Sequence, residues 1–423
     1  MVTEVPPWTA PPMEIGEKTV FWRTFYWGTA FAYLVISIIG SVTTFFAIQW
    51  LPIDTFLGFT NLIIFLTWNY LTMMNLFSAS FFGPGYVPRE WKPEDESHIE
   101  FLQFCQPCQG YKVPRSHHCS KCNRCCMKMD HHCPWINNCV GHRNHGFFIR
   151  FLFFAIVGCI HALVIDFNAG YYAVFSGWYR KYGNGTEPII DFTPVSFVSL
   201  IMAIALALAI AIALTILLVA QMKYVVKNMN AIEEYIDGKA RSIRKHAAEY
   251  EQNRNEREQK DKDEDGEEDA SKFPDWVYPY NLGWKLNIKQ VFGNIFDGRT
   301  KGNGTWWPTR DDCNQFSFTI EQLMQKQLKR DRAREFRIVE DFSAKFCAPR
   351  KYGWRVFTRQ PLIDGKMLKV TEGEGIVATR GTQGWIYGYR QTNPADKGWV
   401  PMKCTDYRSP SQEETSDDDK KEK

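Results

Sequence analysis

Four long apolar segments constrain the fold of this chain more than any other feature. The segments are residues 25–48, 56–82, 147–170 and 192–222. Three of them contain no charged side chain, and the third in order carries Arg150 near one end and Asp166 near the other. Each segment is long enough to cross a hydrocarbon layer about 30 Å thick as an α-helix. The sequence therefore predicts a polytopic α-helical membrane protein with four transmembrane helices.

The distribution of Lys and Arg predicts the orientation of these helices. The loop between the second and third segments is rich in Lys and Arg, whereas the other two loops contain only Arg180 and Lys181. Lys18 and Arg23 precede the first segment without the short apolar core and small-residue cleavage site of a signal peptide. Because cytosolic loops carry the excess of positive charge, we expect both termini and the second loop in the cytosol.

Residues 105–139 concentrate side chains that bind metals. This window holds eight of the twelve cysteines and four of the nine histidines, including two Cys-x2-Cys pairs followed by further His and Cys. The spacing indicates zinc, and a reducing cytosol disfavours disulfides. Two tetrahedral sites need eight ligands, so thiols and imidazoles remain for chemistry. Spacing alone leaves open the choice between His117 and His118, and that between Cys125 and Cys126.

The order of these residues resembles a known family. The sequence from Cys105 through Asp130-His131-His132-Cys133-Pro134-Trp135 to Asn144 resembles the cysteine-rich domain of DHHC protein S-acyltransferases. The resemblance implies two structural Zn²⁺ ions, each held in a closed shell by three Cys and one His. The implied ligands of the first ion are Cys105, Cys108, His118 and Cys125. Those of the second are Cys119, Cys122, His132 and Cys139.

The same resemblance implies a protein S-palmitoyltransferase that uses acyl-CoA, such as palmitoyl-CoA, as its co-substrate. Cys133, His131 and Asp130 are left without a metal, and they provide a nucleophile, a base and an orienting carboxylate. Cys133 would attack the thioester of acyl-CoA and carry the chain as an acyl-enzyme. A cytosolic cysteine of a membrane-associated substrate protein would then take the chain in the second half of a ping-pong reaction, with His131 accepting its proton.

Further contacts follow from the resemblance. Lys112, Arg115 and His117 stand where it places contacts to the CoA phosphates, although Lys112 and Arg115 also fit solvated loop charges. Trp135 is expected beside the acyl chain at the membrane interface, or as a plain interfacial anchor. Gly158 stands where family members vary side-chain bulk to set chain length, so a small residue implies a long chain. A helix-packing glycine is the alternative for Gly158.

Two motifs depart from the family pattern. The usual Asp-Pro-Gly after the second segment reads Gly83-Pro84-Gly85 here, and the usual Thr-Thr-x-Glu after the fourth reads Asn230-Ala231-Ile232-Glu233. Both motifs brace the catalytic loop in the family, and Glu233 is retained. Residues 281–293 resemble the family's palmitoyltransferase C-terminal motif, with Asn287 at its polar position.

The chain changes character after the last apolar segment. Residues 240–272 are packed with charges and read as a basic helix followed by a solvated linker. Residues 335–407 show short alternating strands broken by Gly-containing turns and resemble an SH3 domain. This combination resembles the endoplasmic-reticulum member of the family that carries a C-terminal SH3 domain. The terminal Lys420-Lys421-Glu422-Lys423 resembles a dilysine retrieval signal, which also favours the membrane of the endoplasmic reticulum.

The SH3-like region implies a partner or an internal role. Phe342 and Trp385 are expected to line a groove for a Pro-rich ligand, although a groove tyrosine near Cys404 is missing. A structural or intramolecular role is the alternative, a small membrane accessory protein is a further expected partner, and Cys347 is a candidate for regulatory acylation.

The expected organisation divides the chain into seven parts. They are the cytosolic N-terminus (1–24), helices 1 and 2 (25–82), the zinc domain (83–146), helices 3 and 4 with the lumenal loop (147–222), the linker (223–334), the SH3-like domain (335–407) and the charged tail (408–423).

Two other functions compete with acyl transfer. A nucleic-acid-binding zinc finger is disfavoured because the zinc window lies between membrane segments and the net charge is only +3, so no nucleic-acid partner is expected. A catalytically idle scaffold is the stronger alternative. The complete set of Cys133, His131 and Asp130 disfavours it.

Overall fold

A computed structural model describes residues 26–258, 275–293, 300, 302–345, 348–361, 366–382, 384–394 and 396–406. The chain forms two compact units, Met1–Glu321 and Gln322–Lys423. The expected N-terminal region (residues 1–24), the acidic part of the linker, Cys347 and the charged tail (residues 408–423) lie outside the described residues.

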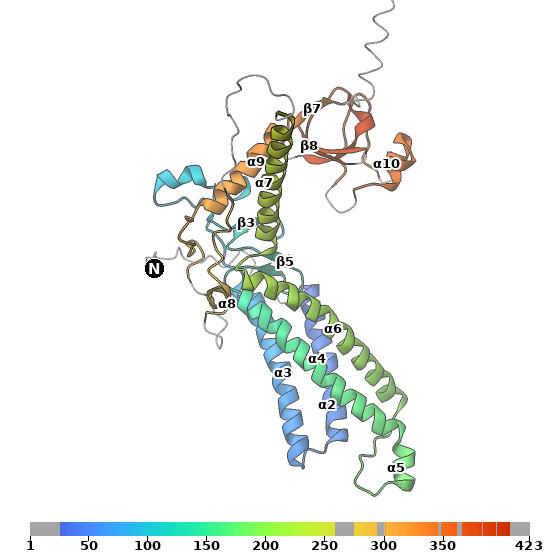
Figure 1. Cartoon of the computed structure of the whole chain (residues 1–423). Helices are drawn as coiled ribbons and strands as arrows, with labels where there is room; N and C mark the ends of the chain where they lie inside the picture. The colour runs from blue at the N-terminus through green and yellow to red at the C-terminus, as the bar shows by residue number, and fades with distance from the viewer. Residues whose placement is uncertain are drawn as a thin grey trace, which may run out of the picture. The chain divides into compact units, whose positions relative to one another are not determined.

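The described part of the first unit contains four helices that are long and apolar enough to cross a membrane, in agreement with the predicted number. They are α2 (Trp27–Trp50), α3 (Phe56–Phe82), α4 (His145–Val174) and α6 (Pro194–Val226). Figure 1 shows them side by side as a bundle, in which α4 packs against the other three. A short helix, α5 (Ser176–Tyr182), follows α4. Helix α6 begins at a capping box in which Thr193 and Ser196 satisfy each other's backbone N–H groups.

The cysteine-rich region between α3 and α4 consists of three two-stranded antiparallel hairpins. The pairs are β1 (Phe104–Cys105) with β2 (Gly110–Tyr111), β3 (His117–Cys119) with β4 (Arg124–Cys126), and β5 (His131–Cys133) with β6 (Asn138–Val140). Two short 3₁₀ helices, η1 (Glu96–Phe101) and η2 (Gln106–Cys108), precede and interrupt the first hairpin. Isolated hairpins of this length are not stable in water, so another interaction must hold them.

Among the described residues between the bundle and the first strand of the second unit lie the helices α7 (Ala231–Glu258), α8 (Trp284–Phe292) and α9 (Ser317–Asp331). Helix α7 begins at a capping box. The Asn230 side chain accepts from the N–H of Glu233 at 2.8 Å, and the Glu233 carboxylate accepts from the N–H of Asn230 at 3.1 Å. The sequence Asn230-Ala231-Ile232-Glu233 departs from the family motif, yet it still caps the start of helix α7. Helix α8 packs against α6, and Asn287 of α8 donates to the Val226 carbonyl at 2.7 Å.

The second unit is built on a four-stranded antiparallel sheet in the order β10-β9-β8-β7. Its strands are β7 (Arg334–Arg337), β8 (Gly375–Thr382), β9 (Trp385–Arg390) and β10 (Lys397–Pro401). Between β7 and β8 the chain adds η3 (Ala348–Tyr352) and α10 (Trp354–Thr358), and η4 (Met402–Cys404) follows β10. Helix α10 is not expected from the sequence, which predicts only strands and turns here.

The aromatic pair expected to line a ligand groove lies in the core of this sheet. Trp385 is 0% exposed and Phe342 is 1% exposed. The indole Nε1 of Trp385 donates to the Val356 carbonyl of α10 at 3.1 Å, and Tyr352 packs edge-on against Phe342. The expected groove surface is therefore covered by a segment of the chain itself.

Candidate active site and metal centres

Two groups of four side chains lie close enough together to hold metal ions. They are Cys105, Cys108, His118 and Cys125, and Cys119, Cys122, His132 and Cys139, with the ligand atoms of each group within 4.8 Å of one another. In the first group, His118 Nδ1 lies 3.3 Å from the Cys108 sulfur. Tetrahedral zinc with Zn–S bonds of about 2.3 Å places its ligand atoms at such separations. The donor sets of three thiols and one imidazole therefore fit zinc.

Strand pairing explains which His and Cys enter each group. His118 lies opposite Cys125 in the β3–β4 hairpin, and His132 lies opposite Cys139 in the β5–β6 hairpin. Opposed side chains of an antiparallel pair are neighbours on one face, so each hairpin offers one imidazole and one thiol to the same cluster. The adjacent opposed pair, His117 and Cys126, projects from the other face of the hairpin. The two choices that spacing leaves open are thus decided by register.

The same alternation gives the two histidines of β5 different surroundings. Neighbouring side chains of a strand point to opposite faces, so His132 faces the second cluster while His131 and Cys133 face the membrane helices. His131 Nδ1 lies 2.7 Å from Asp130 Oδ2. Cys133 is 4% exposed and packs among apolar residues of α3 and α4. The structure therefore brings together the three predicted catalytic residues.

Three donors hold the carboxylate of Asp130. Besides His131, Gln221 Nε2 donates to Oδ2 at 3.0 Å, and the N–H of Ala231 donates to Oδ1 at 3.1 Å. Ala231 is the first residue of α7, whose N-terminal dipole also favours a negative charge. Burial alone raises the pKa of Asp130, but the hydrogen bond from His131 and the nearby imidazoles lower this pKa below its usual range.

The pKa of His131 is shifted in the opposite direction to that of Asp130. Burial lowers the pKa of His131, whereas its hydrogen bonds to Asp130 and Cys133 raise it, and the balance brings the pKa to about 9. Because Nδ1 is bound to the carboxylate, Nε2 is the ring nitrogen left to exchange a proton with the thiol. The Asp-His-Cys arrangement can thus stabilise an imidazolium beside a sulfur nucleophile.

An apolar cavity of about 480 Å³ adjoins His131 and Cys133 between the four long helices. This volume lies within the range of about 300–1,000 Å³ for small-molecule sites. Trp135 lines the cavity, is 42% exposed and packs against Trp27 and Phe31 with ring centroids 6.0 Å apart. Gly158 of α4 also lines the cavity. A Cβ added there would lie 3.4 Å from the Cβ of Trp68, which is ordinary contact.

The three predicted CoA contacts fall in different settings. Lys112 and His117 are half-buried on the cysteine-rich region. Arg115 differs from the expectation, because its guanidinium is fully buried and forms a bidentate ion pair with Glu233 at 2.7 Å. It also donates to the Asn228 carbonyl at 2.7 Å. Arg115 therefore joins the cysteine-rich region to α7.

Several buried polar residues of this junction are not predicted from the sequence. Lys128 donates to Asn228 Oδ1 at 2.8 Å, and its ammonium lies over the ring of Trp307. Burial and the nearby Arg115 hold the pKa of Lys128 well below its usual range. Tyr278 donates to Glu233 at 2.8 Å. Nothing in the local sequence marks these residues, because their hydrogen-bond partners are distant along the chain; Tyr278, for example, lies 163 positions from Arg115.

The altered Gly83-Pro84-Gly85 motif holds the loop through its backbone. The Pro84 carbonyl accepts from the N–H of Arg143 at 3.1 Å, and the Gly85 carbonyl accepts from the N–H of Met127 at 2.9 Å. Gly85 has φ +80°, a conformation that favours glycine. These bonds need no carboxylate, so this contact persists without the usual Asp.

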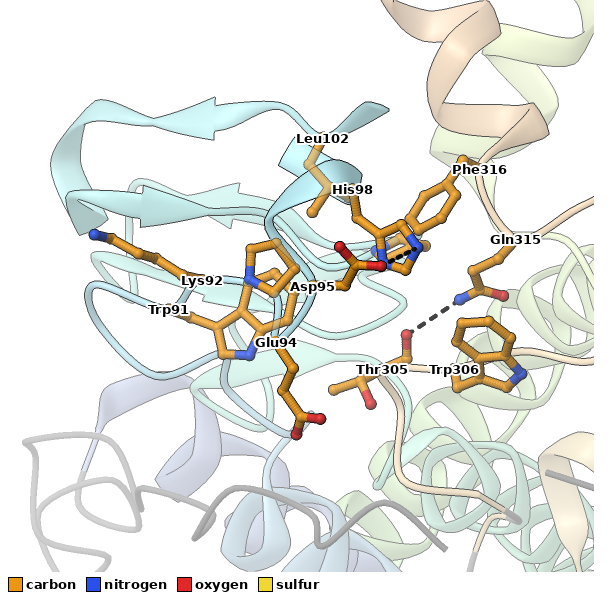
Figure 2. A pocket seen from close by; sticks show the side chains of 12 residues that line it. Trp91, Lys92, Glu94, Asp95, His98, Leu102, Thr305, Trp306, Gln315 and Phe316 are labelled. Carbon is orange, nitrogen blue, oxygen red and sulfur yellow. Dashed lines mark hydrogen bonds and ion pairs between the residues drawn. The ribbon is translucent and has the colours of Figure 1, made fainter. Parts of the chain in front are cut away.

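A second hollow, of about 110 Å³, shares no lining residue with the membrane-side cavity. Figure 2 shows Trp91 on one side of it and Trp306 and Phe316 on the other, with Asp95 paired to His98 at 3.7 Å. None of the predicted site residues lines this hollow. It marks a junction between the segment before β1 and the segment before α9.

A buried thiol and a carboxylate-bound imidazole that line the same apolar cavity indicate an enzyme with a cysteine nucleophile and an apolar substrate. Comparison with known proteins agrees. A sequence model of the DHHC palmitoyltransferase family matches residues 98–238. The chain is 40% identical over 404 residues to the palmitoyltransferase ZDHHC6 of Danio rerio, covering 91% of this chain and 92% of that protein.

The mammalian counterparts are nearly as similar. The palmitoyltransferase ZDHHC6 of Homo sapiens is 37% identical and that of Mus musculus 36% identical, each covering 91% of both chains. The chain belongs to the DHHC palmitoyltransferase family. It is a protein S-palmitoyltransferase with four membrane-capable helices.

Proposed function

We propose that Cys133 carries the acyl chain during the reaction, with His131 as its acid–base partner and Asp130 as the carboxylate that orients the imidazole. One observation supports this most directly. Cys133 and His131 both line the apolar cavity, whereas His132 between them faces a metal cluster. The Cys133 thiol is thus a nucleophile that has an imidazole beside it and that an acyl chain in the membrane bundle can reach.

The first half-reaction exchanges one thioester for another. The Cys133 sulfur attacks the carbonyl carbon of acyl-CoA, its proton passes to His131, and the bond from the acyl carbon to the CoA sulfur breaks. CoA leaves with the proton from His131. The exchange is nearly isoenergetic, so these residues contribute mainly a deprotonated thiol and its position.

The second half-reaction returns the enzyme to its starting state. A cysteine of a substrate protein attacks the acyl-Cys133 thioester, and His131 accepts its proton. The Cys133 sulfur leaves and recovers that proton. Asp130 stabilises the imidazolium in both halves, as carboxylates do in hydrolytic triads. The partners are membrane-associated proteins with cysteines on the same side of the bilayer.

The cavity receives the acyl chain in this proposal. Its walls between α2, α3, α4 and α6 are almost entirely apolar, and the partly exposed Trp135 also lines it. Because Gly158 has no side chain, the α4 side of the cavity leaves room for a long chain such as palmitate. Lys112 and His117 remain the proposed contacts to the CoA phosphates. We assign Arg115 to the brace with Glu233, because its side chain is 0% exposed.

Zinc is the proposed occupant of both metal clusters. Each would be held by the three thiolates and the imidazole of its group, which fills a tetrahedral shell and leaves no position for substrate. The metal would therefore stabilise the short hairpins, and the chemistry would belong to Cys133 and His131.

The setting of the enzyme is part of the proposal. We place it in the membrane of the endoplasmic reticulum with both termini and the cysteine-rich region in the cytosol, as the Lys/Arg bias and the dilysine-like tail favour. The second unit is proposed to be SH3-like in fold. A Pro-rich ligand or a small accessory protein would have to displace α10 to reach Trp385, so an intramolecular role suits this unit better.

A chase experiment tests the two half-reactions separately. Enzyme loaded with radiolabelled palmitoyl-CoA and freed of excess donor should pass its label to a cysteine-containing acceptor peptide at a membrane surface. A serine version of the peptide should take none. Label that stays on the enzyme, or that reaches the peptide only while acyl-CoA is present, would contradict a ping-pong intermediate.

A further inference from the structure

Gln221 is a buried polar residue near the end of the predominantly apolar helix α6. Its side chain is 4% exposed. Nε2 donates to Asp130 Oδ2 at 3.0 Å, and Oε1 lies 2.9 Å from His145 Nε2 of α4. Because a carboxylate only accepts, the amide must turn its nitrogen toward Asp130, and its oxygen then accepts from the His145 ring. Both ends of the amide are used.

This contact also constrains His131. The Oδ2 atom that accepts from Gln221 is the same atom that accepts from His131 Nδ1. Oδ1 accepts from the backbone of Ala231, so donors from β5, α6 and the start of α7 fix one orientation of the carboxylate. Phe148 packs edge-on against the His131 ring with centroids 5.5 Å apart. The imidazole is therefore held by its bonded nitrogen and by one neighbouring ring.

We propose that Gln221 is a positioning residue for acyl transfer: it holds Asp130 so that His131 presents Nε2 to Cys133. The inference rests on the proposed role of Cys133. Gln221 touches neither acyl-CoA nor the thiol in this proposal and acts through Asp130. A hydrogen bond to a charged group is costly to lose when the group stays buried, so the effect on the rate should be large.

The first test uses Gln221→Met in the full-length protein, because Met keeps the length of the side chain without its donor. Single-turnover labelling of Cys133 by palmitoyl-CoA should slow about tenfold, while the half-saturating concentration of palmitoyl-CoA stays unchanged. Thr215→Val is the matched control, since Thr215 bonds only to the Ala211 carbonyl of its own helix in the described structure. Its rate should stay within about twofold of wild type.

A double-mutant cycle separates positioning from a general structural role. Alkylation of Cys133 by a small maleimide, resolved by mass spectrometry, can be measured even in variants that do not turn over. Gln221→Met should slow this alkylation several-fold in the wild-type background and by less than about twofold in the Asp130→Ala background. Equal slowing in both backgrounds, or no slowing in either, would overturn the proposal.

Folding is checked by the zinc content of each variant. If Gln221→Met binds less zinc than wild type, Gln221→Leu replaces it, because a branched apolar side chain also cannot donate to Asp130. A zinc-replete Gln221→Leu variant with the wild-type labelling rate would also overturn the inference. Label that forms on a cysteine other than Cys133 would instead contradict the proposed function, so the two failures are distinguishable.

Discussion

Arg115 and Glu233 form a bidentate ion pair, at 2.7 Å for each bond, in which both side chains are 0% exposed. The pair joins the cysteine-rich region to the first turn of α7. Burial alone opposes ionisation of both groups, but their mutual attraction outweighs it, so the pKa of Arg115 is raised and that of Glu233 is lowered. The ion pair therefore connects the cysteine-rich region to the helix that follows the membrane bundle.

Breaking this ion pair should destabilise the enzyme. Glu233→Gln leaves Arg115 buried without its charge partner, which costs about 3–5 kcal/mol of the free energy of unfolding. Thermal unfolding in detergent measures the change. Lys245→Ala is the control, because its pair with Glu249 on α7 is exposed and should change stability by less than about 0.5 kcal/mol. A Glu233→Gln protein as stable as the control would contradict the brace.

Acid should weaken the same junction through His142. Burial lowers the pKa of His142 to about 3, and the charges of Lys128 and Arg115 add to this effect. The unfolded chain therefore binds a proton near pH 6.5 that the folded protein does not bind. Stability should fall by about 1.4 kcal/mol per pH unit from about pH 6.5 toward about pH 3.

The expected acid sensitivity has a direct control. His142→Gln removes this titratable group. The free energy of unfolding of the variant should therefore decrease less between pH 7 and pH 5.5 than that of wild type. Glu233 contributes at lower pH, because its stabilisation is complete above about pH 4.3 and is lost as the pH falls through the lower folded pKa. Identical losses in wild type and His142→Gln would count against a neutral, buried His142.

Zinc content should distinguish adjacent cysteines. Cys125→Ser removes a member of the first cluster and should lower the bound zinc from two ions to one per chain, because an open shell binds zinc poorly. Cys126→Ser changes the next residue, which belongs to neither cluster, and should retain both ions. Elemental analysis of the purified proteins decides between these results. Loss of zinc in both variants would mean that the register of β3 and β4 does not select the ligands.

Chain-length preference should depend on Gly158. Gly158→Leu places a branched side chain in the cavity wall, so labelling by palmitoyl-CoA should fall about tenfold relative to labelling by dodecanoyl-CoA. Gly170→Leu is the matched control on α4. An added Cβ there also meets its neighbour at 3.4 Å, but Gly170 does not line the cavity. A parallel fall for both donors in the Gly158 variant would indicate a packing role alone.

The sequence predicts the membrane helices well because lipid imposes a local rule, namely some twenty apolar residues in a row. Strand register in these hairpins is likewise determined by residues that lie close together in the sequence. His118 and Cys125 face one cluster because they oppose each other in a hairpin and lie only seven positions apart along the chain. The resemblance to the family supplied these ligands, and the alternation of side chains in the hairpins explains them.

Long-range partners escape such reasoning. The sequence places Arg115 among exposed loop charges or phosphate contacts, because its partner Glu233 lies 118 positions away. From the sequence alone, Gln221 reads as a polar residue near the end of an apolar helix. Its contact with Asp130 arises only in the folded protein. Trp385 is expected on a surface, yet the chain between β7 and β8 folds back as α10 and covers it. Tertiary contacts decide each of these cases.

The most direct test of the proposed chemistry is the covalent state of Cys133. Wild-type protein and Cys133→Ser, each shown to retain its zinc, are incubated with an alkyne-labelled palmitoyl-CoA in detergent. Wild type should take up a label that hydroxylamine removes and that peptide mapping places on Cys133, and the Ser variant should take up none. A folded, zinc-loaded wild type that stays unlabelled, or a Ser variant labelled to the same extent, would contradict an acyl-enzyme at this residue.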